Sequence, residues 1–178
     1  MSSDWMLPGA AQDPQTLTAE WLPHDQPLID GVRVREVRNV LKGTGQLTEV
    51  YRRDWQLDDA AVDQVFQVVL LPGRISAWHA HAHTLDRLFV AEGQARIVLY
   101  DARSGSPTQG LVNEFKVGEH RPALVIVPPR IWHGVQNMGE CNARVINLVD
   151  QAYRYATPDH WRIPADSPHV PFTFPAKA

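Results

Sequence analysis

The sequence predicts an all-β fold, a sandwich or closed barrel of short strands that follows an extended N-terminal arm. Short runs rich in β-branched and aromatic residues recur along the chain, and glycine or proline separates most runs from the next. Histidines at the alternate positions 79, 81 and 83 fit a strand, because alternate side chains of a strand share one face. This rhythm is typical of sandwiches and barrels.

The N-terminal segment differs from the rest of the chain. Pro8, Pro14, Pro23 and Pro27 lie among polar residues and favour an extended arm over a helix. We expect this arm at residues 1–31 and expect it to wrap a partner subunit in a homodimer.

The strands are expected in one barrel domain over residues 32–178. A short helical turn is expected at 57–65, another at 158–161, and an extended proline-rich tail at 164–175. The expected strands are residues 32–37, 47–51, 65–71, 88–91, 95–100, 111–117, 123–127 and 143–149.

Composition limits the function. The chain has 178 residues, of which 44% are hydrophobic, enough for one substantial core and few for two. A formal net charge of −3 without a dense Lys/Arg tract predicts no nucleic-acid partner. The single Cys141 is expected to be a reduced thiol, and every apolar stretch is too short to cross a bilayer. We therefore expect a cytoplasmic protein with no membrane partner.

The histidine run predicts a compact chelating hairpin. His79 and His81 point to one face of a strand, and His83 continues the series. A turn after His83 lets the chain reverse, so Asp86 begins the next strand beside the histidines. Imidazole and carboxylate together suit a divalent transition metal such as iron, manganese, nickel or zinc better than magnesium or calcium.

Two segments resemble the signatures of the cupin superfamily, which implies a jelly-roll barrel. The first segment comprises Gly73, His79, His81, Asp86 and Gly93, with aspartate where glutamate is usual. The second comprises Pro128, Arg130, His133 and Asn137, with arginine where glycine is usual. The resemblance implies a metal site formed by His79, His81, Asp86 and His133.

Alternatives to this metal site stay open. The histidines can instead bind a polar ligand or act as acid and base, since imidazole titrates near neutrality. Asp86 is the weakest of the four ligands, because its side chain is one methylene shorter than glutamate, and it can pair with Arg87 or a histidine instead. His83 is then a substitute ligand or a group that supports one.

A further set of residues resembles the dTDP-4-dehydrorhamnose 3,5-epimerase family. The set comprises Asp101, Arg103, Ser106, Pro107, Thr108, Gly110, Pro128, His133, Gly134 and the tail 158–175. The His79-Ala80-His81 run is similar to that of the related nucleotide-sugar 3,4-ketoisomerases. The resemblance spans residues 65–175 and implies a dimeric barrel that binds a nucleotide sugar as its small-molecule substrate.

The chemistry of that family implies roles for some residues. Such epimerases use a histidine base, a lysine that steadies an enolate and a tyrosine acid, and they work without metal. Here His81 or His79 would be the base and His133 its helper. Asp86 stands at the position of the lysine and would repel an enolate. Ile146 stands near the position of the tyrosine, which leaves Tyr153 and Tyr155 as displaced candidates for the acid.

Several other side chains are candidates for substrate binding. Trp78 and Trp132 flank the histidines and can stack on a sugar or pack in the core. Arg130 is a candidate for an anionic group at the barrel mouth. Arg96 is a second candidate, although its alternation with Ile97 favours an exposed position. His83 completes this set.

Three classes of function remain. The first is a metal-dependent cupin enzyme, either an isomerase acting on a keto sugar or an iron-dependent dioxygenase. The second is a metal-free epimerase or isomerase of a nucleotide-linked keto sugar. The third is a binding module for a sugar or small acid that catalyses nothing. Isomerase comes first, because a divalent ion can replace the missing lysine in stabilising an enolate.

Overall fold

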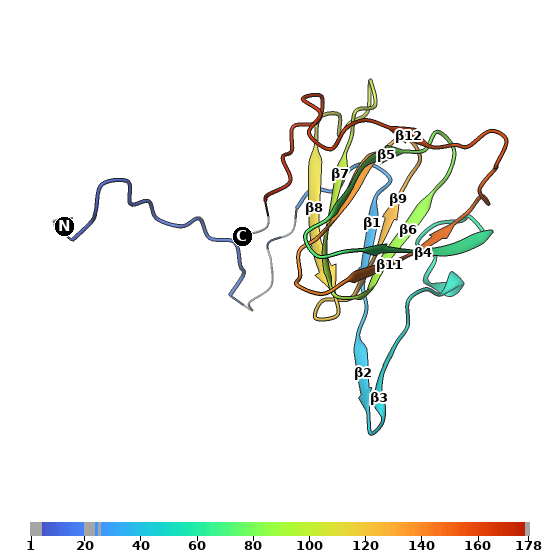
Figure 1. The fold of residues 1–178 in the computed structure, drawn as a ribbon, viewed down its shortest axis with the longest axis horizontal. Coiled ribbons are helices and arrows are strands. Elements are labelled where there is room, and N and C mark those ends of the chain that lie inside the picture. The colour runs from blue at the N-terminus through green and yellow to red at the C-terminus, as the bar shows by residue number, and fades with distance from the viewer. Residues whose placement is uncertain (1–4, 20–23, 25, 177–178) are drawn as a thin grey trace.

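The computed structural model describes residues 5–19, 24 and 26–176, and it confirms the predicted all-β jelly-roll barrel (Figure 1). Its strands are β1 (Arg33–Glu36), β2 (Asn39–Lys42), β3 (Gly45–Thr48), β4 (Gln64–Leu70), β5 (Ile75–Ala80), β6 (Asp86–Glu92), β7 (Gln94–Tyr100), β8 (Val112–Gly118), β9 (Ala123–Val127), β10 (Trp132–Asn137), β11 (Ala143–Val149) and β12 (Trp161–Arg162). The strands in each sheet pair antiparallel throughout.

Two five-stranded sheets form the barrel. One has the order β1-β9-β6-β11-β4 and the other the order β12-β5-β10-β7-β8. Strands β2 and β3 form a separate hairpin that projects from one end of the barrel (Figure 1). The first sheet thus carries β6 and β11, and the second carries β5 and β10, the strands on which the site is built.

The main core fills the space between the two sheets. Alternate side chains of each strand point inward, as Ile97 and Leu99 do on β7 and Val125 and Val127 do on β9. Every residue of β9 is buried, and β9 lies between β1 and β6 in its sheet. This core is the rigid support for the polar groups described below.

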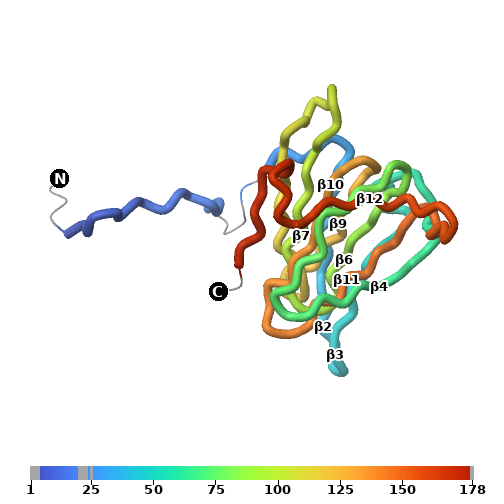
Figure 2. Tube along the Cα trace, turned by 45° about the horizontal axis from the view of Figure 1, so that its top comes forward, coloured from blue at the N-terminus to red at the C-terminus, as the bar shows by residue number. Residues whose placement is uncertain are grey.

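A smaller cluster lies on the outer face of the second sheet. Trp78 and Val98 project away from the main core and pack against Val170 and Phe174 of the C-terminal segment. This segment runs along the barrel beside β7 (Figure 2). The tail therefore covers an apolar sheet face that would otherwise contact water.

The loop between β7 and β8 contains the epimerase-like Asp-x-Arg-x-x-Ser-Pro-Thr run. The buried Asp101 carboxylate accepts hydrogen bonds from the side chains of Arg103, Ser106 and Thr108. Burial alone would raise the pKa of Asp101, but these hydrogen bonds lower it well below its ordinary range. This motif holds the loop in shape.

The structure corrects three element predictions. No helix forms at 57–65, and a short 3-10 turn occurs earlier, at Arg53–Trp55. No helical turn forms at 158–161, where the chain leads into β12. The predicted strand at 47–51 is present as β3, but it begins and ends earlier, at Gly45–Thr48, and pairs with β2. The apolar patterns at 57–65 and 158–161 were too short to distinguish a helix from a turn.

Strand β10 was absent from the predicted strands, although its His133 was assigned to the metal site. Its Trp-His-Gly-Val-Gln-Asn sequence has no alternation of apolar and polar residues that marks a strand. This segment forms a strand because it pairs with β5 on one side and β7 on the other in the folded sheet.

The arm is extended where it is described. Residues 5–19 contain neither helix nor strand and run away from the barrel (Figure 2). The predicted arm also included residues 1–4, 20–23 and 25, which lie outside the described residues. Ile29, placed in the arm by the prediction, is buried in the barrel core and donates its backbone N–H to Asn113. No helix in the described part of the chain is long and apolar enough to cross a membrane.

Candidate active site

A cavity of about 510 Å³ lies between the two sheets, a size typical of sites for small molecules. Residues of β4, β5, β6, β10 and β11 line it, together with the segment 151–162 that leads into β12. Apolar side chains such as Phe66 and Val145 form part of its wall, and a group of histidines and one buried aspartate form its polar part.

The strands bring the predicted ligands to one place. His79 on β5 and His133 on β10 are register partners, so both rings enter the cavity from the same sheet. Asp86 is the first residue of β6, as the sequence predicted. The predicted hairpin is wrong, because β6 lies in the sheet opposite β5 and the two strands do not pair. His81 follows the end of β5 and also lines the cavity.

Three of these residues form a cluster of acceptor atoms. His81, Asp86 and His133 place ligand atoms within 4.8 Å of one another. The Asp86 Oδ2 atom lies 3.4 Å from His81 Nε2 and 3.7 Å from His133 Nε2. Asp86 is only 2% exposed, so little solvent reaches its charge. We call this group the acceptor cluster.

Hydrogen bonds to backbone carbonyls fix which nitrogen of each ring carries a proton. His81 Nδ1 lies 2.5 Å from the carbonyl oxygen of Asp159, and His133 Nδ1 lies 3.2 Å from that of Ile131. A carbonyl only accepts, so both Nδ1 atoms must be N–H donors. In the neutral rings the lone pairs are then on the Nε2 atoms, which face Asp86. Two lone pairs and a carboxylate oxygen repel one another unless a cation lies among them.

Neighbouring groups hold the acceptor cluster in place. The Asn147 amide nitrogen donates to Asp86 Oδ1 at 2.7 Å, and its oxygen accepts the backbone N–H of Arg87. The Asp159 carboxylate accepts backbone N–H groups from the turn after His81. Burial would raise the pKa of Asp159, but those hydrogen bonds lower it to about 2. Such support is typical of residues whose orientation matters for chemistry.

Arg87 does not pair with Asp86, the alternative considered from the sequence. Its guanidinium is fully buried on the other face of β6, where Nε donates to Asp58 at 2.9 Å. It also donates to the carbonyl groups of Ala60 and Leu148. Asp86 is thus left to the histidines.

His79, the fourth predicted ligand, lies beside the acceptor cluster and has both ring nitrogens engaged within the protein. Its Nε2 is 2.9 Å from Ser76 Oγ, and its Nδ1 is 2.9 Å from His160 Nε2. Burial, with smaller contributions from nearby cationic groups, lowers the pKa of His79 to about 3. Burial likewise lowers the pKa of His133 and of His160. These rings are neutral near pH 7.

The lowered pKa of His79 predicts a pH dependence of stability. Unfolded chains protonate this histidine below about pH 6.5, whereas the folded protein keeps it neutral to about pH 3. Its contribution to the free energy of unfolding is therefore complete above about pH 6.5 and falls by about 1.4 kcal/mol per pH unit below it. Urea unfolding of the chelator-treated protein at several pH values measures this slope. His79→Gln should flatten it, and an unchanged slope would contradict the assignment.

The other predicted site residues divide between the cavity and other places. His83 and Tyr153 line the cavity. Tyr155 stacks edge-on against Tyr153 but is 87% exposed and does not line the cavity. Trp78 is buried in the outer apolar cluster, where its indole N–H donates to Ala165. A substrate in the cavity therefore does not stack on Trp78, because residue 78 points to the opposite face from His79.

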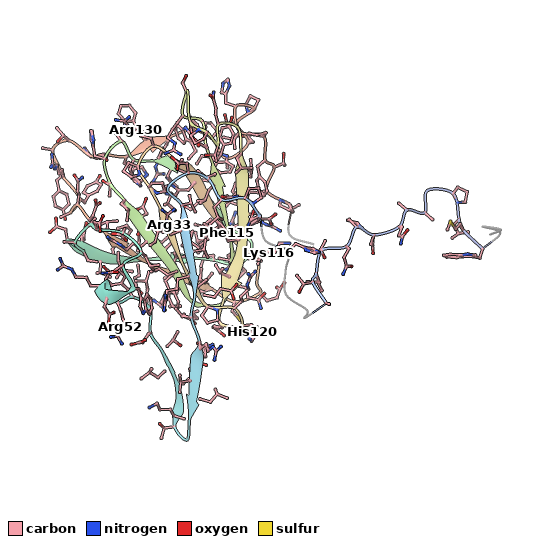
Figure 3. All side chains as sticks on the ribbon, turned by 180° about the vertical axis from the view of Figure 1, so that it is seen from behind. Arg33, Arg52, Phe115, Lys116, His120 and Arg130 are labelled. Atoms are coloured by element: carbon pink, nitrogen blue, oxygen red, sulfur yellow. The ribbon has the colours of Figure 1, made fainter. Side chains whose placement is uncertain are left out.

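Arg96, Arg130 and Trp132 also lie outside this cavity. Arg96 pairs with Glu114 and Gln136 on the outer face of its sheet. Arg130 lies at the end of the barrel opposite the β2–β3 hairpin and, with Trp132, lines a separate hollow (Figure 3). Its φ of 67° explains why glycine is usual at this position. The backbone N–H of Arg130 donates to the carbonyl of His81, so it positions the histidine segment.

Sequence reasoning missed several polar residues of the site. Among them are Ser76, Asn147, Asp159, His160 and Arg162. Asp159 and His160 come from the segment 151–162 that leads into β12, where no local pattern distinguishes a site residue from a surface residue. Asn147 gives the clearest signal, because a polar residue within the apolar run 143–149 calls for a buried partner.

Comparisons with known proteins relate this chain to polysaccharide biosynthesis. A profile of the family described as "Polysaccharide biosynthesis C-terminal domain" matches residues 42–161. The probable low-salt glycan biosynthesis epimerase Agl13 of Haloferax volcanii is 33% identical over 141 residues, covering 79% of this chain and 90% of that protein. The spore coat polysaccharide biosynthesis protein SpsL of Bacillus subtilis is 32% identical over 147 residues, covering 83% and 97%.

A solved structure extends the comparison. The dTDP sugar isomerase from Desulfovibrio desulfuricans superimposes with a TM-score of 0.76 and 28% identity, covering 82% of this chain and 91% of that one.

Proposed function

Because the chain belongs to the polysaccharide biosynthesis C-terminal domain family, we propose that it is a sugar epimerase-like enzyme that moves a proton at the carbon beside the keto group of a nucleotide-linked sugar. The similarity of this chain to a probable glycan biosynthesis epimerase and to a dTDP sugar isomerase supports this reaction class. The single observation that carries it is the acceptor cluster, whose Nε2 atoms face a cavity of the right size for a sugar.

In the proposed reaction His81 is the base. Its Nε2 takes the proton from the carbon, the C–H electron pair forms a carbon–carbon double bond, and the carbonyl electrons move onto the keto oxygen. Asp86, 3.4 Å away, stabilises the imidazolium that forms. Asp86 stands where the dTDP-4-dehydrorhamnose 3,5-epimerases have a lysine. In this reaction it stabilises the base, whereas the lysine stabilises the enolate. Return of a proton to the other face of the same carbon regenerates the keto group and gives an epimer. Protonation of the former carbonyl carbon and of its oxygen, with loss of the proton from the neighbouring hydroxyl, gives an isomer.

Tyr153 is the candidate for the group that returns the proton. It lines the cavity on the segment after β11, and its ring is held edge-on by Tyr155. The phenol hydroxyl of Tyr153 can donate a proton, which is what the acid in this reaction must do.

Deuterium incorporation tests the reaction. The wild-type protein is incubated in D2O with nucleotide-linked keto sugars, beginning with a dTDP-linked 4-keto-6-deoxy sugar, and the substrate is followed by proton NMR. We expect deuterium at a carbon beside the keto group. No exchange in any of the dTDP-, UDP- and GDP-linked keto sugars would overturn the proposed function and favour a module that only binds a ligand.

A metal centre is the second candidate, and the same acceptor cluster favours it. Two imidazole nitrogens and one carboxylate oxygen suit iron, manganese, nickel or zinc, and each histidine donates its other N–H to a carbonyl as metal ligands do. When bound, such an ion would supply Lewis acidity to a substrate oxygen or, in the case of iron, the dioxygen chemistry of a dioxygenase. The two candidates are exclusive at His81, because the base and the ligand would use the same lone pair.

Metal content distinguishes the two candidates. Untagged protein purified without added metal is analysed by mass spectrometry, before and after incubation with iron, manganese, nickel or zinc. A metal centre predicts about one tightly held ion per chain that His81→Ala and Asp86→Ala both lose, whereas Glu114→Gln, which removes a carboxylate outside the cavity, keeps it. No ion in the wild type would exclude the metal centre and leave the lone pair of His81 Nε2 to act as the base.

We also propose that the protein is a homodimer formed along β4. Among the described residues, this strand pairs only with β11, so its other edge is free. Val65, Phe66 and Val69 are between 41% and 57% exposed on it, and a free apolar edge invites another strand. Phe66 also lines the cavity, so a second copy that covers this edge would lie next to the cavity.

Light scattering after size exclusion tests the homodimer. Val69→Lys places a charge on the free edge, and we expect it to convert a dimer to a monomer. Leu41→Lys changes an equally apolar, exposed residue of the β2–β3 hairpin and should leave the dimer intact. A wild-type monomer, or a Val69→Lys dimer, would exclude this interface.

A further inference from the structure

A line of hydrogen bonds leads from β5 to the wall of the cavity. Ser76 Oγ lies 2.9 Å from His79 Nε2, and His79 Nδ1 lies 2.9 Å from His160 Nε2. Arg162 Nε also donates to His160 Nε2, at 3.3 Å. The His160 ring stands between His79 and His81, with ring centroids 5.0 and 5.1 Å away.

The arginine fixes the direction of every bond in this line. Its Nε–H can only donate, so His160 Nε2 must be an acceptor. His79 Nδ1 must then donate to that same nitrogen, which leaves His79 Nε2 to accept the Ser76 hydroxyl. His160 is therefore a neutral ring with its proton on Nδ1.

This Nδ1–H has no protein partner among the described residues, although His160 lines the cavity. Every other ring N–H that the site defines has one: His81 donates to Asp159, His133 to Ile131 and His79 to His160. An N–H whose orientation is fixed at a cavity wall and which has no acceptor within the protein is available to a ligand oxygen.

We propose that His160 is a catalytic residue that donates its Nδ1 hydrogen bond to the keto oxygen on which enolate charge develops, and that Ser76, His79 and Arg162 are positioning residues for it. The inference deepens the proposed function and rests on it. His160 would replace the missing lysine in stabilising the enolate, because a neutral imidazole held in one tautomer can polarise a carbonyl without a full positive charge. His81 takes the proton and His160 keeps its own.

The tautomer is the first test and needs no substrate. Long-range proton–nitrogen NMR of the 15N-labelled protein shows which ring nitrogen carries hydrogen. We expect His160 protonated at Nδ1 only, and we expect Arg162→Met to allow the other tautomer. A His160 protonated at Nε2 in the wild type overturns the inference, whatever the enzyme does.

Deuterium exchange into the keto sugar is the second test. His160→Phe removes the donor and should lower the exchange rate by about 10²–10³-fold, the usual loss for one such donor. His160→Asn keeps an amide N–H near the Nδ1 position and should recover at least part of that loss. Ser76→Ala should lower the rate less than His160→Phe does, and Ser76→Thr, which retains a hydroxyl, should restore it.

The outcomes separate this inference from the proposed function. Exchange by the wild type together with a His160→Phe rate within about threefold of it overturns the role of His160 alone, since a real donor is worth far more. No exchange by the wild type overturns the proposed function and, with it, the role of His160 as a donor to an enolate. The tautomer spectrum is independent of this result and shows whether His160 presents an N–H to the cavity.

Discussion

Replacing His81 by glutamine is expected to lower the rate of deuterium incorporation by about 10²–10⁴-fold, the usual contribution of a general base. The physical reason is that Nε2 of His81 holds the lone pair that faces both the cavity and Asp86. The rate of exchange into a dTDP-linked 4-keto-6-deoxy sugar, measured by NMR at saturating substrate, checks this. Glutamine keeps the polarity and much of the volume of histidine, so the fold should persist.

Matched variants show whether the loss comes from the acceptor cluster. His120→Gln makes the same change at an exposed histidine near the end of the barrel from which the hairpin projects (Figure 3), and the rate should stay at the wild-type value. Asp86→Asn removes the charge but can still accept from Asn147, and it should lower the rate because the imidazolium loses its counter-charge. Asp86→Glu restores the usual cupin carboxylate and should be intermediate. If His81→Gln and Asp86→Asn both exchange at the wild-type rate, the acceptor cluster is not the reacting site.

Removing the carboxylate of Asp58 is expected to give the largest loss of stability. Asp58→Ala leaves the guanidinium of Arg87, which is 0% exposed, without its counter-ion. Removing one partner of a buried pair costs about 3–5 kcal/mol, because a buried charge is left uncompensated. The free energy of unfolding from urea titration at pH 7 measures this loss. The carbonyls of Ala60 and Leu148 remain as acceptors and place the loss at the lower end of that range.

Two controls accompany this variant. Asp59→Ala removes the neighbouring exposed carboxylate and should change the free energy of unfolding by less than about 0.5 kcal/mol. The double variant Asp58→Ala with Arg87→Met removes both charges and should recover much of the loss, since an apolar pair can replace a buried ion pair. A loss below about 1 kcal/mol in Asp58→Ala would show that water reaches the guanidinium.

The sequence predicted the barrel because its information is local. The β-rich runs 95–100, 111–117 and 123–127, which glycine or proline separates from their neighbours, reproduce β7, β8 and β9 to within a residue at each end. It also predicted that Asp86 begins a strand near the histidines, but not that this strand, β6, crosses to the sheet opposite β5 instead of pairing with it.

The sequence alone determined the all-β barrel, the resemblance to sugar epimerases and the candidates His81, Asp86 and His133. Tertiary structure decided which histidine does what. His79 and His81 share a spacing and a face, but Ser76 and His160 engage both nitrogens of His79, whereas Asp159 leaves one nitrogen of His81 free. These partners lie up to 81 residues apart in the chain, and no local pattern encodes a hydrogen bond over that separation. Only closure of the barrel and the return of its tail determine the direction of each proton at the site.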